Sequence, residues 1–183
     1  FISKVKYAIT ITAPTNGTLV VLNGTDTVHD NDMIEHGTVL TVNATGNEGY
    51  EVDELKANGN DIVGGSVNVT AATTITATFK KKTYAITITP ATNGTLVVKN
   101  GSVVLAGGEL IEHGTVLTAT ATANTGYRVD SIKAGTQKVA ADGTFTVTEA
   151  VTVEAVISQI PKYVITFANP ANGTLEVKNG IAP

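Results

Sequence analysis

A tandem duplication is the feature that most limits what this chain can fold into. Tyr7 begins the stretch YAITIT, Tyr84 begins the same six letters, and Tyr163 begins the related YVITFA. The first two copies align without a gap from Tyr7 to Lys56, at an offset of 77 residues. Such agreement marks an internal repeat. A repeat of this length is too long for one coil of a solenoid but long enough for a small core of its own, so we expect separate units in a row.

The repeat divides the chain into four parts. We expect a lead-in over residues 1–6, repeat unit 1 over 7–82, repeat unit 2 over 83–161 and a partial repeat unit 3 over 162–183. The segments KKKT (80–83) and SQIPK (158–162) are interpreted as short, solvated linkers. Because links this short leave little room for bending, we predict an elongated rod.

The partial unit 3 has two explanations. It contains the first two expected strands, 163–168 and 173–178, without the strands that would cover them, and a hairpin alone is marginal in water. Either the sequence, which starts at Phe1 rather than Met, is a piece of a longer protein, or residues 163–183 associate with another chain by strand addition. The first explanation is favoured, because nothing in the repeat resembles a specialised terminal cap.

Alternation of apolar and polar residues predicts an all-β fold. Tyr7, Ile9 and Ile11 fall on one face of the first strand, and Asn-Gly pairs follow at the turns. These pairs tolerate the positive φ that tight hairpins need. We expect about six short antiparallel strands in each unit. The best helix candidate, HDNDMIEHG from residue 29, is at most one turn.

A slip in this alternation predicts a β-bulge in each unit. Tyr50 and Val52 face one way, but Leu55 continues one residue out of phase around Asp53. The second copy repeats the slip around Asp130. One extra residue in a strand is the mark of a bulge or a bend.

Equivalent apolar residues predict one core pattern for both units. Aromatic residues make up only 5% of the chain and Trp is absent, so Val, Ile, Leu and Ala must form the core. Together with Thr, these side chains suit pleated sheet. We expect the units to superpose and to bury the pairs Ile9 with Ile86, Leu19 with Leu96, Leu40 with Leu117, and Tyr50 with Tyr127.

Composition excludes several classes of protein. The net charge is −4 and no basic patch is visible, which argues against nucleic-acid binding. The chain has no Cys, so it holds neither disulfides nor thiolate metal sites. No apolar run approaches the roughly 20 residues that a membrane-spanning helix needs.

Three acidic residues, Asp26, Asp30 and Asp32, are the candidate metal ligands. Asp-x-Asp spacing can begin a Ca²⁺ loop built from oxygen ligands. The second copy has SVVLAGGEL at this place, so the site would not belong to the shared unit. The Gly and Glu positions of an EF-hand are also missing. A solvated loop is therefore the favoured interpretation, and we predict no metal and no cofactor.

Two histidines, His36 and His113, occupy equivalent places between Glu and Gly. A metal or proton site repeated in each unit is one hypothesis. Neighbouring side chains diverge in extended backbone, so the favoured interpretation is a turn into the next strand, in which Gly supplies the special dihedral.

Seven Asn residues stand in N-x-S/T sequons, the acceptor pattern for N-glycosylation. Most of them precede Gly, and Asn-Gly is also good hairpin chemistry, so the turn is the favoured interpretation. The candidates are Asn16, Asn23, Asn43, Asn68, Asn93, Asn100 and Asn172. The chain shows no persuasive Ser-His-Asp order, no G-x-S-x-G elbow and no phosphate loop. We therefore predict that it is not an enzyme and has no catalytic residues.

The order of the motifs resembles a known repeat family. NGT is followed by GTVLT and then by GYEVDELKA or GYRVDSIKA, and unit 2 ends in TFTVTEAVTVEAVI. This order resembles the divergent branch of the internalin-type B repeats of bacterial surface proteins, over both complete copies and the start of the third. Those repeats usually carry Trp after the GY strand, where this chain has Leu55 and Ile132. The resemblance implies a small β-grasp-like sheet unit, a secreted or cell-wall location, a spacer or adhesion role and no catalytic residues.

The combined expectation is a non-catalytic bacterial module, extracellular or at the cell surface, that serves as a structural spacer or adhesion stalk. Two alternatives stay open. One is a module that binds a carbohydrate or protein ligand on a host or neighbouring cell. The other is a filament subunit that self-associates through residues 163–183. Sugar sites usually stack aromatic rings, and the expected burial of Tyr50 and Tyr127 argues against the carbohydrate ligand.

Overall fold

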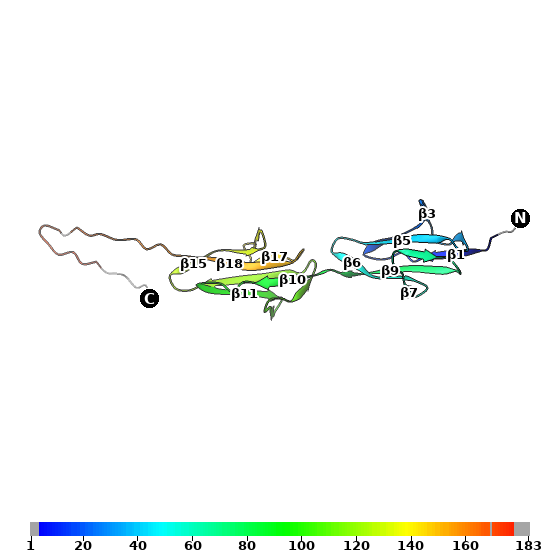
Figure 1. Ribbon diagram of the computed structural model, residues 1–183. Coiled ribbons are helices and arrows are strands. Elements are labelled where there is room, and N and C mark those ends of the chain that lie inside the picture. The colour runs from blue at the N-terminus through cyan, green and yellow to red at the C-terminus, as the bar shows by residue number, and fades with distance from the viewer. Residues whose placement is uncertain (1–3, 169, 178–183) are drawn as a thin grey trace.

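The strands form two similar units that follow one another along the long axis of the molecule (Figure 1). The computed structural model describes residues 4–168 and 170–177. Residues 1–3 of the expected lead-in, and residues 169 and 178–183 of the expected partial unit 3, lie outside the described residues. No helix occurs in the part of the chain that is described. The expectation of an all-β chain built from tandem units is therefore confirmed.

Each unit contains nine strands, several of them very short. In unit 1 they are β1 (Lys6–Ile11), β2 (Gly17–Asn23), β3 (Asp26–Val28), β4 (Asp32–Glu35), β5 (Val39–Gly46), β6 (Tyr50–Ala57), β7 (Asn60–Asp61), β8 (Ser66–Asn68) and β9 (Thr73–Lys81). In unit 2 they are β10 (Thr83–Ile88), β11 (Gly94–Asn100), β12 (Val103–Val104), β13 (Leu110–Glu112), β14 (Val116–Ala123), β15 (Tyr127–Ala134), β16 (Gln137–Lys138), β17 (Thr144–Thr146) and β18 (Val151–Gln159).

The strands of each unit form two sheets that share one core. In unit 1 the strand order is β4-β1-β9-β6-β7 in the larger sheet and β3-β2-β5-β8 in the smaller. Unit 2 repeats this order as β13-β10-β18-β15-β16 and β12-β11-β14-β17. Ile9 and Ile75 from the larger sheet pack with Val21, Leu40 and Val42 from the smaller one. Each unit is therefore built from two facing sheets.

One pairing in each unit is parallel, which corrects the expectation of purely antiparallel units. β1 lies beside β9 with Ile9 opposite Thr73, and β10 lies beside β18 with Ile86 opposite Val151. The first and last long strands of a unit therefore run in the same direction. As a consequence, the chain enters a unit at one end and leaves at the other. Antiparallel first and last strands would have returned the chain to its starting end.

The core pattern agrees with the predicted pairs, with one exception. Ile9, Leu40, Ile86 and Leu117 are fully buried, and Leu19 and Leu96 are half-buried against the same cores. Leu55 and Ile132, which stand where related repeats carry Trp, also pack against them.

The exception is the aromatic pair Tyr50 and Tyr127. Both side chains are only half-buried and neither belongs to a core cluster. Tyr50 begins β6 and pairs with Lys81, at the end of the unit where the chain leaves it. The expectation that these two rings are core residues is therefore wrong.

The predicted β-bulges are confirmed. The register of β6 against β9 shifts between Val52 and Glu54, and that of β15 against β18 shifts between Val129 and Ser131. Asp53 and Asp130 are the extra residues, as the slip in the alternation indicated.

Of the two segments interpreted as solvated linkers, KKKT is mostly strand, whereas SQIPK is strand only in its first two residues. Lys80 and Lys81 end β9, and Thr83 begins β10, so Lys82 is the single residue between them. Lys80 lies 3.3 Å from Asp53, across the bulge. Ser158 and Gln159 similarly end β18. The chain therefore passes from one unit to the next as almost continuous extended backbone.

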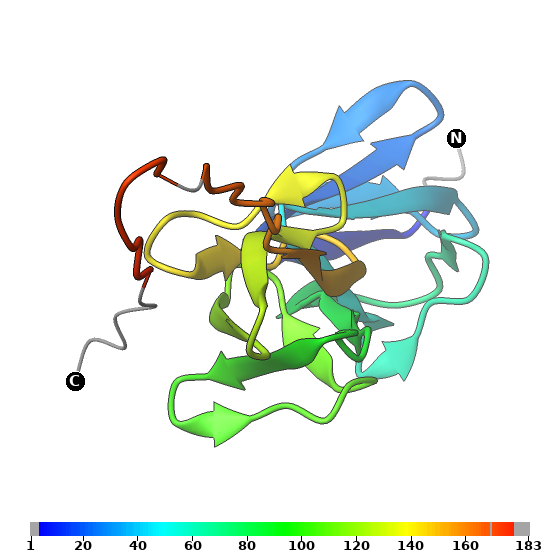
Figure 2. The ribbon, with the colours of Figure 1, turned by 90° about the vertical axis from the view of Figure 1, so that its left-hand side faces the viewer.

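The two units are turned relative to one another about the long axis. The hairpin of β2 and β3 lies at the top of unit 1, whereas its counterpart of β11 and β12 lies at the bottom of unit 2 (Figure 1). The view along the axis shows the same two hairpins on opposite sides (Figure 2). Equivalent faces of successive units therefore point in different directions.

The described residues of the partial unit 3 form no strand. Residues 161–168 and 170–177 are exposed throughout, and they extend away from unit 2 (Figure 1). Tyr163, Val164 and Ile165 expose 84%, 91% and 71% of their surface. The described residues of this part of the chain are therefore mainly in contact with solvent.

Candidate functional site

The candidate acidic ligands hold a loop together rather than forming an ion cage. Asp30 Oδ1 accepts a hydrogen bond from the Ile11 N–H at 2.8 Å, and Asp32 Oδ2 accepts one from the His29 N–H at 2.7 Å. Asp26 begins β3 and pairs with Asn23. Among the described residues no group of three His, Asp or Glu side chains comes together to hold a metal ion.

Unit 2 holds the equivalent loop with one carboxylate. Glu109 accepts hydrogen bonds from the N–H groups of Ala106 at 2.6 Å and Gly107 at 2.7 Å. The Ala106 N–H, followed by the other backbone donors, lowers the pKa of the Glu109 carboxyl below its ordinary value. The sequences HDNDM and AGGEL therefore do the same structural task with different residues.

The exposed sequons are compatible with both interpretations of the Asn-Gly pairs. Asn16 and Asn93 have positive φ angles of 65° and 63°, as a tight turn requires. All seven sequon asparagines are exposed. Turn chemistry accounts for the two residues with positive φ, and whether any of the seven is modified stays a prediction to be tested.

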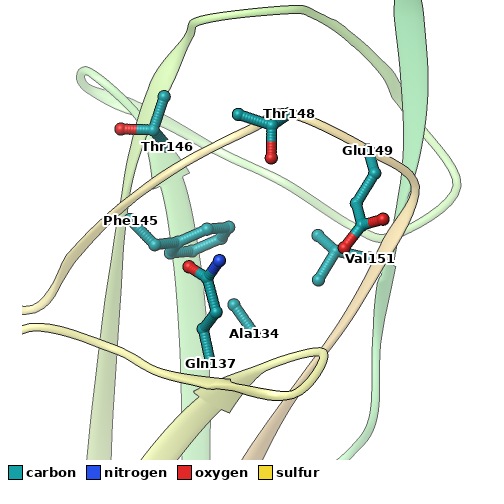
Figure 3. A pocket seen from close by; sticks show the side chains of 7 residues that line it. All are labelled: Ala134, Gln137, Phe145, Thr146, Thr148, Glu149 and Val151. Carbon is teal, nitrogen blue, oxygen red and sulfur yellow. The ribbon is translucent and has the colours of Figure 1, made fainter.

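The cavities give no strong sign of a small-molecule site. The one in Figure 3, between Ala134, Gln137, Phe145 and Val151, has a volume of about 20 Å³, enough for one water molecule. An open groove of about 380 Å³ lies beside Ala119 and Ala121, and another of about 430 Å³ lies beside β2. Among the described residues that line these two grooves there is no Tyr, Phe or Trp on which a sugar ring could stack.

The place where unit 1 meets unit 2 is the best-defined site in the molecule. We call it the joint, and it consists of Gly49, Lys81, Lys82, Glu112 and His113. Lys82 donates its N–H to the Gly49 carbonyl at 2.8 Å, and its own carbonyl accepts the N–H of His113 at 2.8 Å. The residue between the units is thus hydrogen-bonded to both.

Side chains close the joint around this backbone bridge. Lys81 Nζ, at the end of β9, lies 3.3 Å from Glu112 Oε2, at the end of β13. The ring of His113 lies against Gly49, so closely that a Cβ at residue 49 would overlap it. Gly49 is buried, although the turn that contains it lies at the end of unit 1. The imidazole fills a space that only Gly leaves open.

The contacts of the joint recur at the outer ends of the two units. The histidine side of the joint recurs at the start of unit 1, and the glycine side recurs at the end of unit 2. His36 donates its N–H to the Val5 carbonyl at 2.8 Å, and Lys4 Nζ lies 3.0 Å from Glu35 Oε2. At the other end, Ile160 donates its N–H to the Gly126 carbonyl at 2.9 Å. Gly126 is exposed, and a Cβ there would meet no atom within 4 Å.

The residues of the joint were visible in the sequence, but their contact was not. GYEVDELKA contributes the turn glycine, and IEHGTVLT contributes the histidine. Gly37 and Gly114, which follow the two histidines, have φ angles of 84° and 82°, so the interpretation of these places as turns is confirmed. What sequence reasoning missed is that the histidine of one unit packs on the turn of the unit before it.

The fold and the joint together define a tandem all-β repeat whose units are connected end to end. The chain belongs to the divergent InlB B-repeat domain family, which matches residues 7–83 and again residues 84–161. Members of this family are repeat modules of bacterial surface proteins and are generally non-catalytic. The comparison with curated proteins gave no match. No described helix is long and apolar enough to cross a membrane.

Proposed function

We propose that this chain is a non-catalytic stalk segment of a bacterial surface protein, located outside the cell. Its task is to hold what is attached to it at a distance. The observation that supports this proposal is the parallel pairing of the first and last strands in each unit, because it makes every unit pass the chain from one end to the other.

The dimensions of the units suit this task. A nine-residue strand such as β9 spans about 30 Å. The strands run along the long axis, so each unit adds about this length (Figure 1). A stalk must also resist bending, and the joint supplies that resistance through contacts from both units.

Replacing the joint glycine tests the proposal. Gly49→Ala places a Cβ against the His113 ring, so we expect the units to lose their fixed alignment. Gly126→Ala is the matched control, because φ is +77° at Gly49 and +84° at Gly126 but the space around Gly126 is open. Each substitution carries a similar backbone strain of about 1–2 kcal/mol. Residual dipolar couplings measured by NMR report whether the two units share one alignment.

The expected result is one common alignment in the original chain and in Gly126→Ala, and two different alignments in Gly49→Ala. A chain whose units already tumble independently near neutral pH would contradict the proposed stalk. The maximum dimension from small-angle scattering provides a second measure of the same property.

Assembly through the partial unit 3 is a second candidate function. The exposed side chains of Tyr163, Val164, Ile165 and Phe167 support it, because an exposed apolar segment can add as a strand to the edge of another sheet. We nevertheless expect a monomer by light scattering, both for the whole chain and after removal of residues 162–183. An oligomer that becomes a monomer on removal would favour the filament subunit over the stalk.

A further inference from the structure

One polar atom in the joint has no partner. Nδ1 of His113 is buried, and it is the one buried side-chain nitrogen or oxygen among the described residues that makes no hydrogen bond. Buried polar atoms are almost always hydrogen-bonded, so an exception needs an explanation.

The neutral form of the imidazole suits this place. A neutral ring carries one hydrogen, on either nitrogen. Nε2 of His113 is not among the buried unpartnered atoms, so it can carry the hydrogen and meet solvent. Cδ2, Cγ and Nε2 are the ring atoms nearest to Gly49. Nδ1 then remains a buried bare acceptor, which costs less than a buried N–H without an acceptor.

The protonated form does not suit it. The second proton can bind only at Nδ1, where it would create a buried donor with nothing to accept it and would add a positive charge. The charged and titratable groups on the segments that meet at the joint are Lys81 and Lys82 from the linking backbone, Glu48 and Tyr50 beside Gly49, and Glu112 and Tyr84 from unit 2. Glu112, the carboxylate nearest in sequence, already faces Lys81.

We infer that the joint is sensitive to acid: it accepts the neutral ring of His113 and opens when Nδ1 is protonated. This inference rests on the proposed stalk function and adds regulation to it. Near neutral pH the stalk is held straight, and in mildly acidic surroundings its units move independently while each keeps its fold. Histidine is the side chain whose charge normally changes in this pH range.

The chain contains its own control in His36. The Tyr7 and His36 rings are 5.9 Å apart with an interplanar angle of 58°, and the Tyr84 and His113 rings are 6.0 Å apart with the same angle. The local surroundings within the unit are thus the same. The difference is the turn of the preceding unit, which covers His113 but not His36: His36 is exposed and His113 is half-buried.

Dipolar couplings at two pH values test the inference on the whole chain. Between about pH 7.5 and about pH 5 we expect the ratio of docked to undocked molecules to fall about tenfold. His113→Phe keeps a flat ring against Gly49 but cannot take up a proton, so its units should share one alignment at both pH values. His36→Phe replaces the equivalent ring at the uncovered site and should keep the full response to acid.

Several outcomes would overturn the inference. They are an original chain that stays aligned at both pH values, a His113→Phe chain that opens in acid, or a His36→Phe chain that no longer does. If the units of His113→Phe are already misaligned near neutral pH, the Phe ring does not fit the space beside Gly49. His113→Gln, which also lacks a titrating ring, then replaces it in the same comparison. Failure of the stalk proposal can be distinguished from failure of this inference. If the stalk proposal is wrong, the two units of the original chain tumble independently already near neutral pH.

Discussion

Leu40→Ala is expected to lower the free energy of unfolding of unit 1 by about 2–5 kcal/mol, the usual cost of a cavity at a buried leucine. Leu40 is fully buried between the two sheets of unit 1, and Leu117 occupies the same place in unit 2. Leu117→Ala should therefore have the same effect on unit 2. In a domain this small, such a loss can exceed half of the total stability.

The effect should stay within the mutated unit. Each unit has its own core cluster, and the joint contributes two backbone hydrogen bonds, one exposed ion pair and one ring contact. Differential scanning calorimetry should therefore resolve two transitions, of which Leu40→Ala shifts one and Leu117→Ala the other. A single cooperative transition that either substitution shifts equally would contradict independent units.

Exposed neighbours on the same strands provide the controls. Val39 and Val116 are 59% and 56% exposed and stand next to the two leucines. Val39→Ala and Val116→Ala should change the unfolding free energy by about 0.5 kcal/mol or less, as is usual at the surface. A large effect there would show that these valines are covered in solution.

The sequence predicted the features that depend on neighbouring residues. The alternation from Tyr7 to Ile11 and the Asn-Gly turns specify strands through local chemistry. The slip at Asp53 shows in the sequence because a bulge moves every later side chain to the other face. The fully buried residues Ile9 and Leu40 followed from the same alternation.

Features that depend on distant partners were missed. The parallel pairing of β1 with β9 joins residues more than 60 positions apart, and alternation does not reveal which strand a strand will pair with. β4, within the stretch taken as at most one helical turn, is an edge strand that pairs only with β1. The contact of His113 with Gly49 joins two units, whereas the comparison of copies reveals only what one unit repeats.

The glycine of the repeated NGT motif has a role beyond the turn. Gly17 begins β2 and Gly94 begins β11. Neither of these glycines has a positive φ angle. Their lack of a side chain matters for space instead. A Cβ on Gly17 would overlap the ring of Phe79, and a Cβ on Gly94 would overlap the backbone carbonyl oxygen of Thr122 and the side chain of Ile157. The motif therefore lets the two sheets approach closely at this end of each unit.

Substitution of these glycines by Ala should have graded effects on stability. Gly94→Ala should cost unit 2 about 3 kcal/mol, the upper part of the usual range for overpacking, because the Thr122 carbonyl belongs to the β11–β14 ladder and cannot turn aside. Gly17→Ala should cost unit 1 less, about 1–2 kcal/mol, because the Phe79 side chain can rotate away. Chemical denaturation of each variant, monitored with a signal specific to each unit, measures the change in the unfolding free energy of both units.

The third copy of the motif is the matched control. Gly173 stands in ANGTLEV, where a Cβ would meet no atom within 4 Å, so Gly173→Ala should leave the stability of both units unchanged. The expected order is a large loss at Gly94, a smaller loss at Gly17 and none at Gly173. Equal small losses at all three would mean that the glycine serves only the turn. A loss at Gly173 comparable to that at Gly94 would mean that the third copy is packed in solution, and would reopen assembly through the partial unit 3.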